Sequence, residues 1–226
     1  MLADLPNLGL YRRLTALALV VGPALFLLDN ILHPKEFGRG NEARQLVEIG
    51  THYQRWQFAH GIGLLSAVIM TGALLGLAFH VRRSRPTLGM IGGALAVAGA
   101  VGLGAGFAID GYTWGTLGAI STESKVDPGT VQYALHTVQY SHWLIPYYGL
   151  IGLWIAGIVI LAIGVRRTAP LWAAGLLGLG GLLVGIEGTI AENWYFVVSS
   201  VVLFAGGCAV ALVIGRMDDR AFAGVP

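Results

Sequence analysis

The sequence predicts an all-α polytopic membrane protein that forms a single domain, a bundle of six transmembrane helices. Of its 226 residues, 55% are hydrophobic and only 12% are charged, which is too apolar for an ordinary soluble domain. The apolar residues gather in six runs, each close to the length of about 20 residues that crosses a bilayer. The predicted helices cover residues 14–33, 57–80, 87–110, 142–165, 169–190 and 194–215.

The first run resembles a signal peptide, because a basic pair before an apolar stretch is typical of one. Arg12 and Arg13 precede this run. No small-residue cleavage site follows, and the run continues to Asp29. We therefore interpret it as a retained helix.

The later runs are separated by polar or helix-breaking residues. An arginine pair and then a proline end the second and fourth runs, and proline is well tolerated in the first turn of the helix that follows. Glu192 and Asn193 mark the turn into the last run. The two arginine–proline turns are Arg82-Arg83 with Pro86, and Arg166-Arg167 with Pro170.

Small residues inside the runs are expected to serve packing. The chain has 34 glycines, and small residues let transmembrane helices approach closely. A phosphate-binding loop would need a β-strand before the glycines. The single cysteine, Cys208, cannot form an intrachain disulfide and is also interpreted as a packing residue. We expect His80, near the far end of the second run, to be exposed.

Two connections are long. Residues 34–56 contain an amphipathic stretch that begins near Asn41 and predicts a short helix. Residues 111–141 are rich in Gly, Thr and Ser and predict a loop. Near its end, a second short helix is expected to place three side chains on one face, those of Tyr133, His136 and Tyr140.

The basic residues predict the orientation. Nine lie at the ends that include both termini, and five lie on the other side, where acidic residues dilute them. The positive-inside rule therefore predicts a protein of the cell membrane with both termini in the cytoplasm. The net charge of +2 gives no reason to propose a nucleic-acid partner. The nine are Arg12, Arg13, Arg82, Arg83, Arg85, Arg166, Arg167, Arg216 and Arg220.

Most of the polar groups near lipid lie at the outer ends of these runs. Because consecutive spans are antiparallel, the end of one run and the start of the next share a side of the bilayer. Charge near lipid is costly and needs a partner or a function, so we expect one connected outer site. Its candidate members are Asp29, His33, His60, Asp110, His142 and Glu187.

A metal ion is one candidate occupant of this site. Asp29 and His33 are spaced i, i+4 and therefore project from one helical face. With His60 or His142 from a neighbouring helix they would make a site for Zn, Cu or Fe. Alternatively, Asp29 and His33 simply end the helix at the headgroup level.

His60 is also a candidate haem ligand. It lies one turn inside its run, and Gly61 and Gly63 would leave room for a flat ligand. Haem iron accepts a single axial histidine. The alternative is a core histidine that bonds a carboxylate such as Asp110.

Catalytic roles are predicted for Asp110, Glu187 and His142. A carboxyl group in a low-dielectric site suits a general acid, or a base activated by a histidine. The alternative is a pair that fixes helix register. Tyr147 is a candidate lining residue of a pocket for a lipophilic molecule with one polar centre.

The stretch Trp56-Gln57-Phe58-Ala59-His60 resembles the styrene oxide isomerases, which are small membrane-embedded haem proteins. The likeness extends to Leu88-Gly89 and reappears at Leu144-Ile145-Pro146-Tyr147, within the first four runs. It implies that His60 is the axial ligand of haem b and that Tyr147 lines the pocket. In that family ferric haem binds the epoxide oxygen as a Lewis acid, and a hydride shift gives an aldehyde. The remainder resembles actinobacterial-type six-helix membrane proteins of unknown function.

The leading interpretation is a membrane-embedded enzyme, an isomerase, with an outward pocket for a small lipophilic substrate. Its cofactor would be haem b, a single transition-metal ion or none. A second interpretation is a small-molecule or proton-coupled transporter that uses the same groups as a proton relay. A third is an accessory membrane subunit without chemistry. The expected partners are the lipid bilayer, a small lipophilic ligand and a second copy of the chain.

Overall fold

The computed structural model describes residues 7–33, 42–123, 126–139, 144–190 and 193–223. These residues form helices and no β-strand, which confirms the all-α prediction. In chain order the elements are α1 (Leu8–Leu32), α2 (Glu42–Thr51), α3 (Tyr53–Ser84), α4 (Pro86–Ser121), α5 (Pro128–Gln139), α6 (Leu144–Val165), α7 (Leu171–Ile190), α8 (Asn193–Arg216) and α9 (Asp219–Phe222).

Five helices are long and apolar enough to cross a membrane, which confirms the multi-pass membrane character by length and composition. They are α1, α3, α4, α8 and the part of α6 from Tyr148 to Val165. The remaining predicted span corresponds to α7, whose apolar stretch Leu171–Ile186 is shorter than the other five. The prediction of a sixth span therefore stays a prediction.

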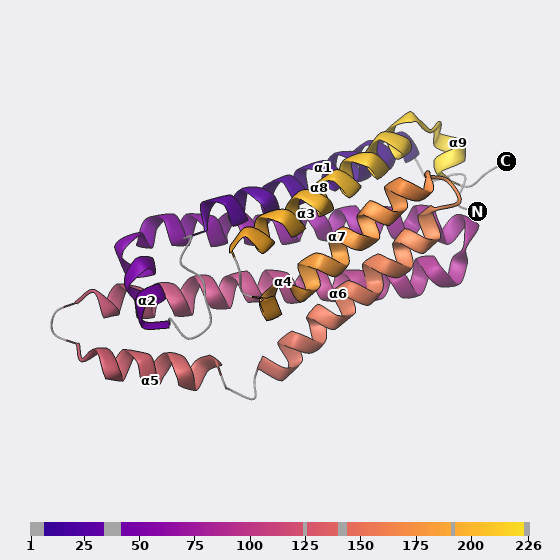
Figure 1. Cartoon of the computed structure of the whole chain (residues 1–226). Helices are drawn as coiled ribbons and strands as arrows, with labels where there is room; N and C mark the ends of the chain where they lie inside the picture. The colour runs from indigo at the N-terminus through magenta and orange to yellow at the C-terminus, as the bar shows by residue number, and fades with distance from the viewer. Residues whose placement is uncertain (1–6, 34–41, 124–125, 140–143, 191–192, 224–226) are drawn as a thin grey trace.

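The long helices form an antiparallel bundle (Figure 1). Each packs against the next long helix along the chain, and α8 also packs against α1. The start of α1 and α9 lie at one end of the bundle, and α2 and α5 lie at the other (Figure 1). The end of α1 and the start of α3 are therefore neighbours at the α2 end.

Glycines determine how closely the helices approach, as the sequence predicted. A Cβ atom on Gly22 would collide with Met70, and one on Gly99 would collide with the backbone of Trp154. Large apolar side chains point outward instead; Phe58, for example, is 64% exposed. Small residues inside and large apolar residues outside are what a helix bundle surrounded by lipid requires.

The expected loop at 111–121 is wrong, because α4 continues as a helix through Ser121. Three glycines on one side of this extension are close to α2 and α3. A Cβ on Gly111 would meet His60, one on Gly115 would meet Gln57, and one on Gly118 would meet Ile49. A glycine-rich helix is weak by itself, so these contacts stabilise it.

Both short helices predicted in the connections are present. Leu46 of α2 and Val131 and Leu135 of α5 are buried together and form a small second core against the α4 extension. Tyr133 and His136 both lie on the exposed side of α5, in agreement with their predicted position on one face. Tyr140 lies outside the described residues.

His80 was expected at the surface and is instead buried beneath the C-terminal segment. Its Nδ1 donates to the carbonyl of Phe222 at 3.0 Å, and its ring stacks on the Phe222 ring with centroids 5.3 Å apart. Its Nε2 lies 2.9 Å from the Thr168 hydroxyl. Arg12 Nε forms an ion pair with Asp219 Oδ1 at 3.0 Å. Both packing and an ion pair therefore hold α9 against the bundle.

Candidate functional site

The rings of two histidines and a tryptophan pack together, tilted to one another, where α1 ends and α3 begins. The ring centroids of Trp56 and His60 are 4.2 Å apart, and His33 lies 4.7 Å from Trp56 and 5.0 Å from His60. The Phe107 ring of α4 meets His60 edge-on at 6.3 Å. Because α1 and α3 are antiparallel, helix geometry brings these rings together although 27 residues separate His33 from His60.

The tautomer of His60 is determined by its own helix. Its Nδ1 lies 3.0 Å from the carbonyl oxygen of Trp56, which can only accept a hydrogen bond. Nδ1 therefore carries the proton, and Nε2 has a lone pair. A neutral imidazole of this kind can accept a proton or bind a metal ion.

The α4 extension holds the start of α3 in place. The carbonyl of Gly111 accepts a hydrogen bond from Trp56 Nε1 at 3.2 Å and another from Gln57 Nε2 at 2.7 Å. The absence of a side chain on Gly111 lets this carbonyl come so near to α3. Gln57 and Phe107 were not predicted as site residues, since an amide near a helix start and a phenylalanine in an apolar run carry no distinct signal.

Asp29 is the most unusual group of the site. Its side chain is 0% exposed, and neither carboxylate oxygen has a hydrogen-bond partner among the described residues. It lies on the face of α1 between Phe26, which packs edge-on against Phe107, and His33. An ionised carboxylate buried in this way would cost several kcal/mol. We refer to Asp29, His33, Trp56 and His60 as the Asp29–His60 cluster.

Polar side chains around the cluster form hydrogen bonds at the C-terminal end of α1. Arg55 Nε donates to the carbonyl of Leu32 at 2.6 Å, a favourable position for a cation at a helix C-terminus. Asn30, next to Asp29, donates to the Ser200 hydroxyl of α8 at 2.7 Å. Burial lowers the pKa of His33 well below its ordinary value, and the nearby His60 and Arg55 lower it further.

The predicted metal site is not assembled among the described residues. No three side chains of His, Cys, Asp or Glu in that part of the chain are arranged to hold a metal ion. Asp29, His33 and His60 share one end of the α1–α3 interface, but the Asp29 carboxyl group forms no hydrogen bond with either histidine. Metal binding by this cluster stays a prediction.

The space expected for a flat ligand beside His60 is occupied. A Cβ on Gly63 would collide with the Phe107 ring, so this glycine accommodates a phenylalanine of α4. Gly61 has open space beside it, but the His60 ring itself is enclosed by Trp56, His33 and Phe107. In this arrangement the described residues do not fit a haem b on His60.

Of the three predicted catalytic residues, Asp110 has a described side chain, and it does not face His60. Asp110 is exposed, while its neighbour Gly111 faces His60, so the expected pairing of Asp110 with His60 is not formed. His142 lies outside the described residues. Glu187 and Tyr147 belong to α7 and α6, but their side chains lie outside the described part of the structure.

Comparison with protein-family models, with curated proteins and with solved structures finds no match to this chain. The resemblance to the styrene oxide isomerases therefore stays a prediction.

Proposed function

We propose that the chain is a proton-coupled membrane transporter in which the Asp29–His60 cluster binds and releases the coupling proton. The proposal includes six spans, both termini in the cytoplasm and a cluster that faces the outer side. The observation that carries it is the buried carboxyl group of Asp29, which lacks a hydrogen-bond partner among the described residues. Intramembrane acidic and histidine residues are the usual parts of proton relays.

The charge on Asp29 decides which species it binds. A carboxylate buried without a partner is costly, so the side chain either carries a proton or is compensated by a bound cation. The neighbouring aromatic rings pack closely, with the centroids of Trp56 and His60 4.2 Å apart. A proton needs no cavity, and it is therefore the species that suits this packing best.

The two histidines supply a route to the outer surface. His33 lies one turn beyond Asp29 on α1, and its ring contacts that of His60. Because its pKa is lowered, His33 is neutral near pH 7 and is a transient carrier rather than a store of the proton. In this mechanism Asp29 stores the proton, and the histidines exchange it with water.

Proteoliposomes test the proposal. Protein reconstituted with a trapped pH-sensitive dye should acidify the interior when a membrane potential drives protons inward. Asp29→Asn should abolish this flux, because an amide cannot release a proton. Asp110→Asn is the matched control, since Asp110 is an exposed acidic residue of a neighbouring helix, and it should retain the flux. Equal flux with Asp29→Asn and wild-type protein would contradict the proposal.

A second candidate function is a metal-dependent membrane enzyme that acts on a small lipophilic substrate. One observation favours it: the Nδ1 atom of His60 is held by a backbone carbonyl, as in many metal-binding histidines, which leaves Nε2 to bind. A visible absorption spectrum and a metal analysis of the purified protein test this candidate. A bound transition metal that His60→Ala removes would favour the enzyme, and a colourless, metal-free protein would reject it.

A further inference from the structure

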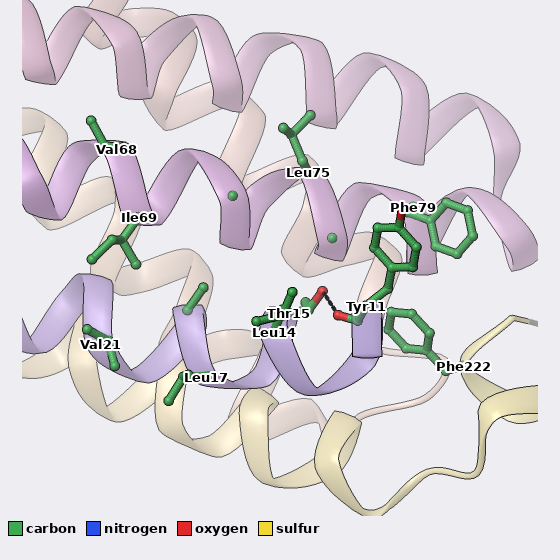
Figure 2. A pocket seen from close by; sticks show the side chains of 13 residues that line it. Tyr11, Leu14, Thr15, Leu17, Val21, Val68, Ile69, Leu75, Phe79 and Phe222 are labelled. Carbon is green, nitrogen blue, oxygen red and sulfur yellow. Dashed lines mark hydrogen bonds between the residues drawn. The ribbon is translucent and has the colours of Figure 1, made fainter. Parts of the chain in front are cut away.

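A groove lies between α1 and α3 in the half of the bundle away from the Asp29–His60 cluster. Its volume is about 750 Å³, and apolar side chains of both helices line it. Figure 2 shows Val21 and Val68 toward one end and Tyr11, Phe79 and Phe222 at the other. The floor is formed by small residues of α3, among them Gly72 and Gly76. The groove is therefore narrow, apolar and open at the side of the bundle.

The dimensions of the groove match one lipid chain. From Val68 to Phe79 it follows α3 for about 16 Å at a rise of 1.5 Å per residue. One leaflet contributes about half of the ~30 Å hydrocarbon core, or about 15 Å. A groove of this length at the α9 end of the bundle would span one leaflet.

The positively charged side chain of Arg83 lies at that end of the groove. The guanidinium carbon of Arg83 lies 4.7 Å from the centroid of the Phe79 ring, and Phe79 lines the groove. Nη2 of Arg83 is buried without a hydrogen-bond partner among the described residues, and none of them forms an ion pair with Arg83. Within the described part of the chain, the guanidinium group therefore has unused hydrogen-bonding capacity and no carboxylate partner.

We propose that this groove binds one acyl chain of an anionic phospholipid, whose phosphate group pairs with Arg83. Guanidinium groups bind phosphate through charge-assisted hydrogen bonds, and a lipid anchored in this way would place its tail along Gly72. The ring of Phe222 lines the groove at this end.

Two glycines provide a matched pair of variants. A Cβ atom on Gly72 would meet nothing within 4 Å, so Gly72→Leu fills the groove without a clash in the bundle. Gly175 of α7 is also open and exposed, and it does not line the groove, so Gly175→Leu is the control. Arg83→Gln removes the charge and keeps a similar length.

Native mass spectrometry of the whole protein, with phosphatidylglycerol or phosphatidylcholine added in detergent, tests the proposal. The wild-type protein and the control Gly175→Leu should each retain one phosphatidylglycerol, and Gly72→Leu should lose it. Arg83→Gln should reduce the preference for phosphatidylglycerol by about fivefold. Equal retention of the two lipids by wild-type protein would overturn the proposal. Retention by Gly72→Leu, or a dimer of the chain that this variant dissociates, would also overturn it.

Discussion

The imidazole of His60 packs against the indole of Trp56, with ring centroids 4.2 Å apart and the planes inclined by 35°, and donates its Nδ1 proton to the Trp56 carbonyl at 3.0 Å. The hydrogen bond determines the tautomer of His60, and the contact makes Trp56 a spectroscopic reporter for the cluster. His33 touches both rings, so a charge on either histidine lies beside the indole.

The fluorescence of Trp56 is predicted to respond to acid pH. Protonated imidazole quenches indole emission, and an ordinary histidine is half protonated near pH 6.5. Because burial lowers the pKa of His33, quenching should begin only well below this value. The difference in emission between wild-type protein and Trp56→Phe isolates the signal. Quenching centred at the ordinary histidine pKa would show that His33 is solvated and would contradict the burial argument.

Gly111 and Gly61 are predicted to respond to alanine with opposite signs. Gly111→Ala places a Cβ 2.8 Å from that of His60 and should lower the free energy of unfolding by about 1–3 kcal/mol. Gly61→Ala meets open space in the middle of α3 and should raise it by up to about 1 kcal/mol through helix propensity. Unfolding in a denaturing detergent measures both variants. Equal effects would contradict the close packing of α4 on His60.

The attachment of α9 is predicted to contribute to stability. Phe222 is 0% exposed and stacks on His80, so Phe222→Ala should cost about 3 kcal/mol. Phe58→Ala is the control, because Phe58 is 64% exposed on the outer surface of α3 and loses few protein contacts. Thermal unfolding midpoints compare the two. A midpoint for Phe222→Ala that matches Phe58→Ala would mean that α9 is not packed on the bundle.

The proposed orientation predicts which side of the membrane each turn occupies. With Cys208 replaced by alanine, a membrane-impermeant thiol reagent added outside cells should label Glu123→Cys, which follows α4. It should not label Ser84→Cys, at the turn between α3 and α4. The reverse labelling pattern would invert the topology and place the Asp29–His60 cluster on the cytoplasmic side.

Much of the fold could be predicted from the sequence, because long apolar runs are a strong signal of membrane-spanning helices. The extension of α4 could not. Gly111, Gly115 and Gly118 give this segment the composition of a loop, and only contacts with α2 and α3 make it helical. Such contacts join residues far apart in sequence, so a local pattern cannot show them.

The candidate site was predicted in part for a similar reason. The i, i+4 spacing of Asp29 and His33, with antiparallel helices, was enough to place both at the end of the α1–α3 interface where His60 lies, and the His33 ring contacts that of His60. The rotation of α4 about its axis was not predictable, since an apolar run with glycines on several sides has no distinct buried face. Asp110 was therefore expected at His60, although Gly111 occupies that place.

Infrared difference spectroscopy of Asp29 tests the central claim most directly. A protonated carboxylic acid has a C=O stretching band that is separate from the bands of carboxylates and amides. The wild-type protein at neutral pH should show this band, and its position should shift in heavy water. Asp29→Asn should remove it, and Asp110→Asn should leave it unchanged. A band that persists in Asp29→Asn would contradict the claim that Asp29 stores the proton. A wild-type spectrum without the band would contradict it as well.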